Sequence, residues 1–437
     1  MSDRGGPPHL HSLDVVRVLT VALVIAVHTV SQQPGGTGLT NGALLIVMHV
    51  SREVFFLLTA FVLGYSYRDR APKRWPAFWR RRYLLIGVPY LVWSAVYFVA
   101  LGQGWQPAGF VRAVLTGTAQ YHLYFLLVSM QLYLVFPVLR WVLRATRGRH
   151  GWLLATAFAY QIAVYAVVQR WQGDPNPVLA SYLGFVVVGG IAAGHAETFF
   201  AFTRRHLRQV FLGTAIAVTS GVGWFFVQVA WLGRTTVAAS EVFQPVVVLE
   251  SFAVAWTFLA LGLTWQDRRM PGRRAIRAAA DASFGVYLAH PLLLQGLLAV
   301  SAATGLTAVA ERLSGAVVTA VAMVVAVPLI YLTCVTAVAS IRRTPLSLPL
   351  TGHGRASFGM PFWPSPAMPL SAAACAARCS RSCRASFGMP FWPSPAMPLP
   401  AAACAARCSR SCPGRRTGGP TVVPISPGGL QCERQAA

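Results

Sequence analysis

The chain has 437 residues, of which 55% are hydrophobic and only 11% are charged. Soluble domains carry about 25% charged residues, so this composition excludes a soluble globular protein and indicates an integral membrane protein. The net charge of +25 does not indicate nucleic-acid binding, because the basic residues stand at the ends of apolar segments and form no patch with interleaved aromatic residues.

Ten apolar segments are long enough to cross a bilayer, which requires about 20 residues each. We therefore predict an all-α, polytopic membrane protein with about ten transmembrane helices, in contact with the lipid bilayer. The predicted spans are 13–30, 43–66, 83–101, 122–140, 152–170, 179–195, 209–231, 244–264, 281–301 and 315–341.

Basic residues alternate between the connections of these spans. The connections after spans two, four, six and eight, and the residues after span ten, carry two or more basic residues, whereas the intervening connections carry one or none. Basic loops stay in the cytoplasm. We therefore expect a multi-pass protein of the plasma membrane with both termini in the cytoplasm: a short N-terminus, 1–12, a membrane domain, 13–343, and a tail, 344–437.

The tail differs from the rest of the chain in composition. Residues 355–383 recur as 384–412 with one substitution, and both copies are rich in Pro, Ala, Ser and Arg. This composition predicts a low-complexity, disordered segment. Seven of the eight cysteines fall in the tail, but their spacing matches no zinc or iron–sulfur pattern, and we predict no metal site.

Arg17 and His28 lie inside the first span, where polar groups are costly unless they face protein or a watery cavity. Eleven helical steps leave the two side chains on one face, about 16 Å apart along the axis. An imidazole can accept a proton near neutral pH and act as a general base. We predict Arg17 and His28 as catalytic residues; an inert interfacial histidine is the alternative. Asp14, one turn before Arg17, is expected to pair with it.

The second and fourth spans carry further candidates. Arg52 and Glu53 lie close to mid-bilayer, next to His49 on the helix surface. They form either a structural ion pair or part of a substrate site, and the sequence leaves both open. His122 begins the fourth span at its outer end, where it is expected to line the mouth of a site.

The ninth span places Ser283, Tyr287 and His290 on one helix face, because they are spaced by four and three residues. Pro291 beside His290 is expected to leave a backbone carbonyl free. A buried hydrogen-bonded triplet without chemistry is the alternative to a site.

Five segments in this order resemble acyltransferase family 3, a family of integral membrane O-acyltransferases. They are LDVVRVLTVALVIAVH, REVFFLLTAF, FWRRRYLLIGVPYLVW, YHLYFLLVSMQLYLVFPVL and SFGVYLAHPLLL. Arg17 and His28 match the arginine–histidine pair of the family's first helix. The chain departs from the family in helix three, where Leu85 and Ile86 occupy the region of a second arginine.

The resemblance implies transfer of an acyl group, with acetyl as the expected group, from cytoplasmic acyl-CoA to a hydroxyl of a sugar, glycolipid or secreted metabolite of the cell envelope. The chain would then bind acyl-CoA as donor substrate through Arg81 and Arg82, whose guanidinium groups suit phosphates. The hydroxyl-bearing acceptor, a carbohydrate by expectation, would contact the remaining candidates: Glu53, His122, Tyr287 and His290.

A multi-pass transporter or flippase is the rival reading, since buried charges also suit transport. The chain shows no clear inverted repeat of broken helices, which is the sequence sign of many transporters. Substrate movement without consumption of acyl-CoA would favour this rival.

Overall fold

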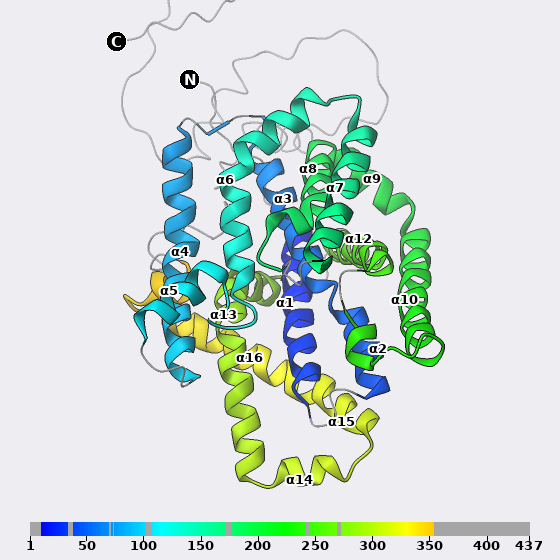
Figure 1. The fold of residues 1–437 in the computed structure, drawn as a ribbon. Coiled ribbons are helices and arrows are strands. Elements are labelled where there is room, and N and C mark those ends of the chain that lie inside the picture. The colour runs from blue at the N-terminus through cyan, green and yellow to red at the C-terminus, as the bar shows by residue number, and fades with distance from the viewer. Residues whose placement is uncertain are drawn as a thin grey trace, which may run out of the picture. The chain divides into compact units, whose positions relative to one another are not determined.

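The computed structural model describes residues 10–353, except 34–37, 70, 73, 102–105, 171–175, 242–243 and 269–271. Every regular element in this described part is a helix, which confirms the all-α prediction (Figure 1). The duplicated segments 355–383 and 384–412, with the seven tail cysteines, lie outside the described residues, so their predicted disorder stays a prediction.

Eight helices within the described residues are long and apolar enough to cross a membrane. A ninth candidate is the pair α8 (Leu183–Gly194) and α9 (Ala196–Arg205), which is bent by 93° at its break. The predicted span 152–170 forms α7 (His150–Arg170), which is not among the eight. The eight are α1 (Ser12–Ser31), the pair α2 (Leu39–Met48) and α3 (Ser51–Ser66), α4 (Trp75–Ala100), α6 (Tyr124–Ala145), α10 (Leu207–Ala230), α12 (Pro245–Asp267), α13 (Arg273–Ala303), and a last span built from α15 (Gly315–Val321), the π turn η2 (Ala322–Ala326) and α16 (Val327–Ile341).

Short helices join these spans. They are α5 (Pro107–Thr116), the 3-10 helix η1 (Leu179–Tyr182), α11 (Thr236–Ala239), α14 (Leu306–Glu311) and α17 (Ser347–Thr351).

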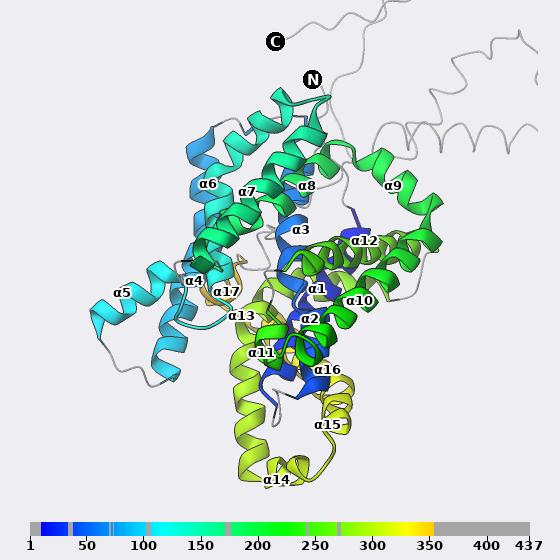
Figure 2. The same cartoon turned by 45° about the vertical axis from the view of Figure 1, so that its right-hand side comes forward.

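Helix α1 lies in the middle of the bundle and contacts α2, α3, α12, α13 and α16 (Figures 1 and 2). Its apolar side chains therefore face neighbouring helices on several sides, and Val16, Val21, Ile25 and Val30 are all buried. A helix that is apolar around most of its circumference is typical of such a central position. The polar side chains Asp14, Arg17 and Thr20 of α1 are likewise buried in protein.

Glycine permits the closest helix contacts. A Cβ atom on Gly189 of α8 would lie 2.3 Å from the carbonyl oxygen of Leu57 in α3. A Cβ atom on Gly262 of α12 would lie 2.3 Å from the carbonyl oxygen of Ser12 in α1. Small residues let transmembrane helices approach backbone to backbone. These two contacts fix α3 against α8, and α12 against the start of α1.

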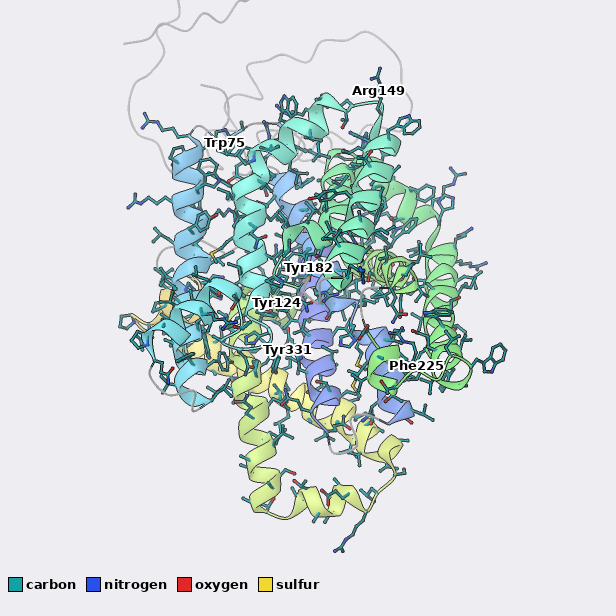
Figure 3. All side chains as sticks on the ribbon, viewed as in Figure 1. Trp75, Tyr124, Arg149, Tyr182, Phe225 and Tyr331 are labelled. Carbon is teal, nitrogen blue, oxygen red and sulfur yellow. The ribbon has the colours of Figure 1, made fainter. Side chains whose placement is uncertain are left out.

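The basic connections after spans two, four and six meet at one end of the bundle. Arg140 Nε donates to the Tyr67 carbonyl at 3.1 Å, and an Arg144 guanidinium nitrogen donates to the Arg68 carbonyl at 3.0 Å. Arg68 also pairs with Glu197 of α9 at 2.6 Å. Figure 3 labels Trp75 and Arg149 at this same end. Basic residues that alternate between connections along the sequence therefore lie together in the folded protein.

The membrane unit continues to His353, beyond the expected boundary at 343. Trp93 Nε1 of α4 donates to the Leu350 carbonyl at 3.1 Å, which holds α17 against α4. The Ser347 hydroxyl donates to the His353 carbonyl at 2.7 Å, and the His353 side chain is buried. The first ten residues of the expected tail thus belong to the helical bundle.

Candidate active site

Three histidines that are distant in the sequence gather around one place. His28 lies near the end of α1, His122 in the turn before α6, and His290 in α13. The ring centroids of His28 and His290 are 5.5 Å apart, and those of His122 and His290 are 5.4 Å apart. His122 and His290 are fully buried, whereas His28 is partly exposed. The structure thus brings together three of the residues that the sequence singled out separately.

Tyrosines hold this cluster in place. The Tyr287 hydroxyl donates to the His122 carbonyl at 2.5 Å, which ties α13 to the turn before α6. The Tyr97 hydroxyl of α4 donates to the Leu288 carbonyl at 2.7 Å, and its ring centroid lies 5.3 Å from that of His122. Four helical segments therefore contribute to one buried polar site.

Two tyrosines near the histidines, Tyr97 and Tyr121, were not predicted as site residues. Tyr97 sits among apolar neighbours in its span, and its sequence gives no signal of a polar partner. Tyr121 fits an aromatic belt at the membrane interface by sequence. In the structure its ring lies 4.4 Å from that of His28, and its hydroxyl accepts a hydrogen bond from Gln32 Nε2 at 3.1 Å. Only the packing of the helices identifies both as neighbours of the histidines.

Arg17 is buried on α1 and does not face lipid. A guanidinium nitrogen of Arg17 lies 3.6 Å from Asp14 Oδ1, which confirms the expected pair. Asp281 of α13 and His353 also interact electrostatically with Arg17. Burial lowers the pKa of His353, and the neighbouring Arg342 lowers it further. The Arg17 end of α1 is thus a buried polar cluster of its own.

Glu53 belongs to a second polar network. Arg52 Nε donates to Glu53 Oε1 at 2.9 Å, and another guanidinium nitrogen donates to Asn176 Oδ1 at 2.5 Å. The Arg52 guanidinium also lies over the Tyr182 ring, 5.3 Å from its centroid. Figure 3 shows Tyr182 and Tyr124 near the middle of the bundle. The sequence left open whether Arg52 and Glu53 form a structural ion pair or part of a substrate site. The structure shows the ion pair.

A row of aromatic rings joins this network to the histidine cluster. Tyr182 packs on Phe56 with ring centroids 4.4 Å apart, Phe56 on Phe125 at 4.6 Å, and Phe125 on Tyr287 at 5.3 Å. Glu53 therefore lies at the far end of this row from the imidazoles.

The two predicted donor-binding arginines lie in different surroundings. Arg82 is buried, and its guanidinium lies over the rings of Phe78 and Tyr133, 5.6 and 5.3 Å from their centroids. Arg81 is exposed on α4. Arg81 is thus accessible from outside the bundle, while Arg82 anchors α4 against α6.

The described residues contain no group of three or more His, Cys, Asp or Glu side chains arranged to hold a metal ion. The chemistry that the cluster can perform without one is acid–base chemistry, because imidazole takes and returns protons near neutral pH.

Fold and site together define a polytopic helical membrane protein whose helices bring three imidazoles together. A family model described as an acyltransferase domain matches residues 10–335. The chain therefore belongs to acyltransferase family 3, as the five segments indicated, and is a membrane acyltransferase. No curated protein and no solved structure matches it in the same comparisons.

Proposed function

We propose that this acyltransferase moves an acetyl group from cytoplasmic acetyl-CoA to a hydroxyl of a sugar, glycolipid or secreted metabolite, at the plasma membrane. The observation that supports this proposal is the close approach of three imidazoles, that of His28 on the central helix α1 and those of His122 and His290 on its neighbours. Acyl transfer to an alcohol needs a base at the hydroxyl, and imidazole is the usual one.

His28 is the proposed general base because it is the partly exposed member of the cluster, whereas His122 and His290 are fully buried. It accepts the proton of the acceptor hydroxyl as the oxygen attacks the thioester carbonyl. The carbon–sulfur bond then breaks, and the proton passes from His28 to the departing thiolate, which leaves as coenzyme A. A transient acyl-histidine is a second, less favoured route.

The acceptor is proposed to contact His122 and Tyr287, which belong to the same cluster as His28 and His290. Carbohydrate hydroxyls both donate and accept hydrogen bonds, as do tyrosines and neutral imidazoles. Glu53 acts in this proposal through Arg52, by holding the second network at the other end of the aromatic row.

The donor is proposed to enter from the end of the bundle that carries the basic connections. Arg81 is exposed there and suits a phosphate of coenzyme A, since guanidinium groups bind phosphate oxygens in pairs. Arg82 supports α4 beside it. Arg17, lying between this end and His28 along α1, orients the pantetheine arm or the thioester.

Replacing His28 tests the catalytic assignment. Purified protein in lipid nanodiscs is given acetyl-CoA and a panel of alkyl glycosides, and acceptor-dependent release of the coenzyme A thiol is measured. We expect His28→Ala to lower kcat by about 100-fold or more, since a general base contributes about 10² to 10⁴. His195→Ala, on an exposed histidine between α8 and α9, is the matched control and should keep wild-type turnover. Unchanged transfer by His28→Ala would remove His28 from the mechanism.

Replacing Arg17 tests the donor assignment. We expect Arg17→Ala to raise the KM for acetyl-CoA about tenfold or more while the KM for the glycoside stays near wild type, because a charge-assisted contact to the donor is lost. Thermal unfolding in detergent verifies that the variant is folded. Normal donor kinetics in a folded variant would contradict the assignment.

Transport remains the rival function and is measured on the same material. Proteoliposomes that move a glycoside across the bilayer in the absence of acetyl-CoA, with no thiol release when it is added, would support a transporter and overturn the acyl-transfer proposal.

A further inference from the structure

Pro291 leaves one backbone carbonyl of α13 without its helical donor. Proline has no N–H, so the carbonyl four residues earlier, on Tyr287, receives no hydrogen bond from residue 291. The structure fills this vacancy with a side chain: His290 Nδ1 lies 2.7 Å from the Tyr287 oxygen. A carbonyl can only accept, so Nδ1 carries the hydrogen.

This bond determines what the other ring nitrogen of His290 can do. In a neutral imidazole one nitrogen is the donor and the other is the acceptor. With Nδ1 protonated, Nε2 presents a lone pair. Nε2 is buried and makes no hydrogen bond within the described part of the chain. A buried acceptor without a partner is costly, which indicates that it meets a donor during function.

Two imidazole rings lie near that of His290, those of His28 and His122, with centroids 5.5 and 5.4 Å away. We take His28 as the partner because it is the proposed base. Its ring is nearly parallel to that of His290, at 23°, with the centroids 5.5 Å apart. The titratable side chains that interact most with His28 are His290 and His49, and neither is a carboxylate. The other ionisable groups around the pair are Tyr97, Tyr121, His122 and Tyr287.

A histidine general base normally needs a group that holds its tautomer and stabilises the imidazolium, and a carboxylate usually does this. Here an imidazole with a fixed acceptor nitrogen stands where a carboxylate would stand. Catalytic hydrogen bonds often tighten only when substrate binds. The hydrogen bond requires the His28 side chain to turn so that one of its nitrogens meets His290 Nε2.

We propose that His290 is the positioning residue of His28: its Nε2 accepts a hydrogen bond from one ring nitrogen of His28 and thereby leaves the other as the base for the acceptor hydroxyl. This inference rests on the proposed function. No proton is transferred to His290. When His28 takes the hydroxyl proton, its bond to His290 strengthens, and it weakens again when the proton leaves with the thiolate.

Pro291→Ala tests whether the hydrogen bond from His290 Nδ1 to the Tyr287 carbonyl matters, without altering any histidine. The substitution restores an N–H at residue 291, which competes for the Tyr287 carbonyl and frees His290 to adopt either tautomer. We expect kcat to fall about tenfold with an unchanged KM for acetyl-CoA. Pro137→Ala, which removes the proline inside α6, is the matched control and should keep wild-type kcat.

His290→Leu and His290→Gln complete the test. The leucine variant has no acceptor, so we expect kcat to fall about 100-fold and the midpoint of the acidic limb of the pH–rate profile to move to lower pH. The glutamine variant keeps a side-chain oxygen acceptor and should recover most of the loss. A purely structural role predicts instead that both variants lose activity in step with their melting temperature, with the pH profile unmoved.

The outcomes separate this inference from the proposed function. An inactive wild type contradicts the proposed function itself. The role of His290 alone is overturned by a different result. In that result the wild type is active and His28→Ala is inactive, but Pro291→Ala, His290→Gln and any folded His290→Leu keep the wild-type kcat and pH profile.

Discussion

Arg52 and Glu53 show how two opposite charges are tolerated inside an apolar bundle. Glu53 is buried and Arg52 nearly so, with side-chain exposures of 3% and 10%. Arg52 also donates to Asn176 and lies over the ring of Tyr182. A single charge in this position would be far more costly than the pair, because a lone buried ion keeps its desolvation penalty without the compensating attraction.

Removing one partner should therefore destabilise the protein strongly. We predict that Glu53→Gln lowers the free energy of unfolding by roughly 3–5 kcal/mol, the range for breaking a buried pair. The measurement is thermal or denaturant unfolding in a mild detergent. In the double variant Arg52→Met with Glu53→Gln, the loss should be smaller than the sum of the single losses. Additive losses would show that the two side chains do not act as a pair.

His353 makes stability depend on pH. Its folded-state pKa lies below the value of about 6.5 expected in an unfolded chain, so the unfolded state takes up the proton first as pH falls. The folded state is therefore not penalised by His353 above about pH 6.5, and the free energy of unfolding decreases as pH falls through that value. We predict that the melting temperature of the wild type drops more between pH 7 and pH 5 than that of His353→Gln. Parallel pH curves would contradict a buried neutral histidine.

Single residues were predictable where the signal lies within one helix. The eleven-residue spacing puts Arg17 and His28 on one face, and the i,i+3 spacing predicts the pair of Arg17 with Asp14. The approach of His28, His122 and His290 depends on how α1, α13 and the turn before α6 pack. No spacing in a single sequence records that packing, and Tyr97 was missed for the same reason.

Close helix packing through glycine gives the element-scale prediction. Gly189→Ala in α8 would place Cβ 2.3 Å from the Leu57 carbonyl, which is backbone and cannot turn aside. We expect a loss of about 1–3 kcal/mol in stability, or more where α3 and α8 cannot separate. Gly194→Ala at the end of the same helix meets nothing within 4 Å and is the control. Equal melting temperatures for the two variants would show that α3 and α8 are not in backbone contact.

Helix breaks were less predictable than helix positions. Hydropathy located the span 43–66, but the structure begins it at Leu39 and interrupts it between α2 and α3. The 93° bend between α8 and α9 falls at the end of the predicted span 179–195, so hydropathy located this end but not the helix that continues from it in a new direction. A window average reports how apolar a segment is. The direction of the helix axis is set by neighbouring helices, which the window does not contain.

At the scale of the whole molecule, the basic connections after spans two, four and six form one charged end, through contacts such as Arg140 with the Tyr67 carbonyl and Arg68 with Glu197. The sequence predicted this segregation, because each basic cluster is local. Which membrane face it occupies follows from the rule that positive loops stay in the cytoplasm, and is a prediction.

Cysteine labelling measures that sidedness. The seven tail cysteines are replaced by serine, Cys334 is kept because it is buried, and a single cysteine is placed at Arg147 or at Leu306, both exposed. In intact cells, a membrane-impermeant maleimide should label Leu306→Cys and spare Arg147→Cys until the cells are opened. The reverse pattern would place the basic end outside.

The central claim is that His28 on the central helix is the base for acyl transfer between two substrates that meet inside the membrane protein. Proteoliposomes with an alkyl glycoside enclosed and acetyl-labelled acetyl-CoA outside test it most directly, by the label recovered on the enclosed glycoside. We predict labelled glycoside with the wild type and with His195→Ala, and at least about 100-fold less with His28→Ala. Wild-type labelling by a folded His28→Ala variant, or labelling only when donor and acceptor share one face, would contradict the account.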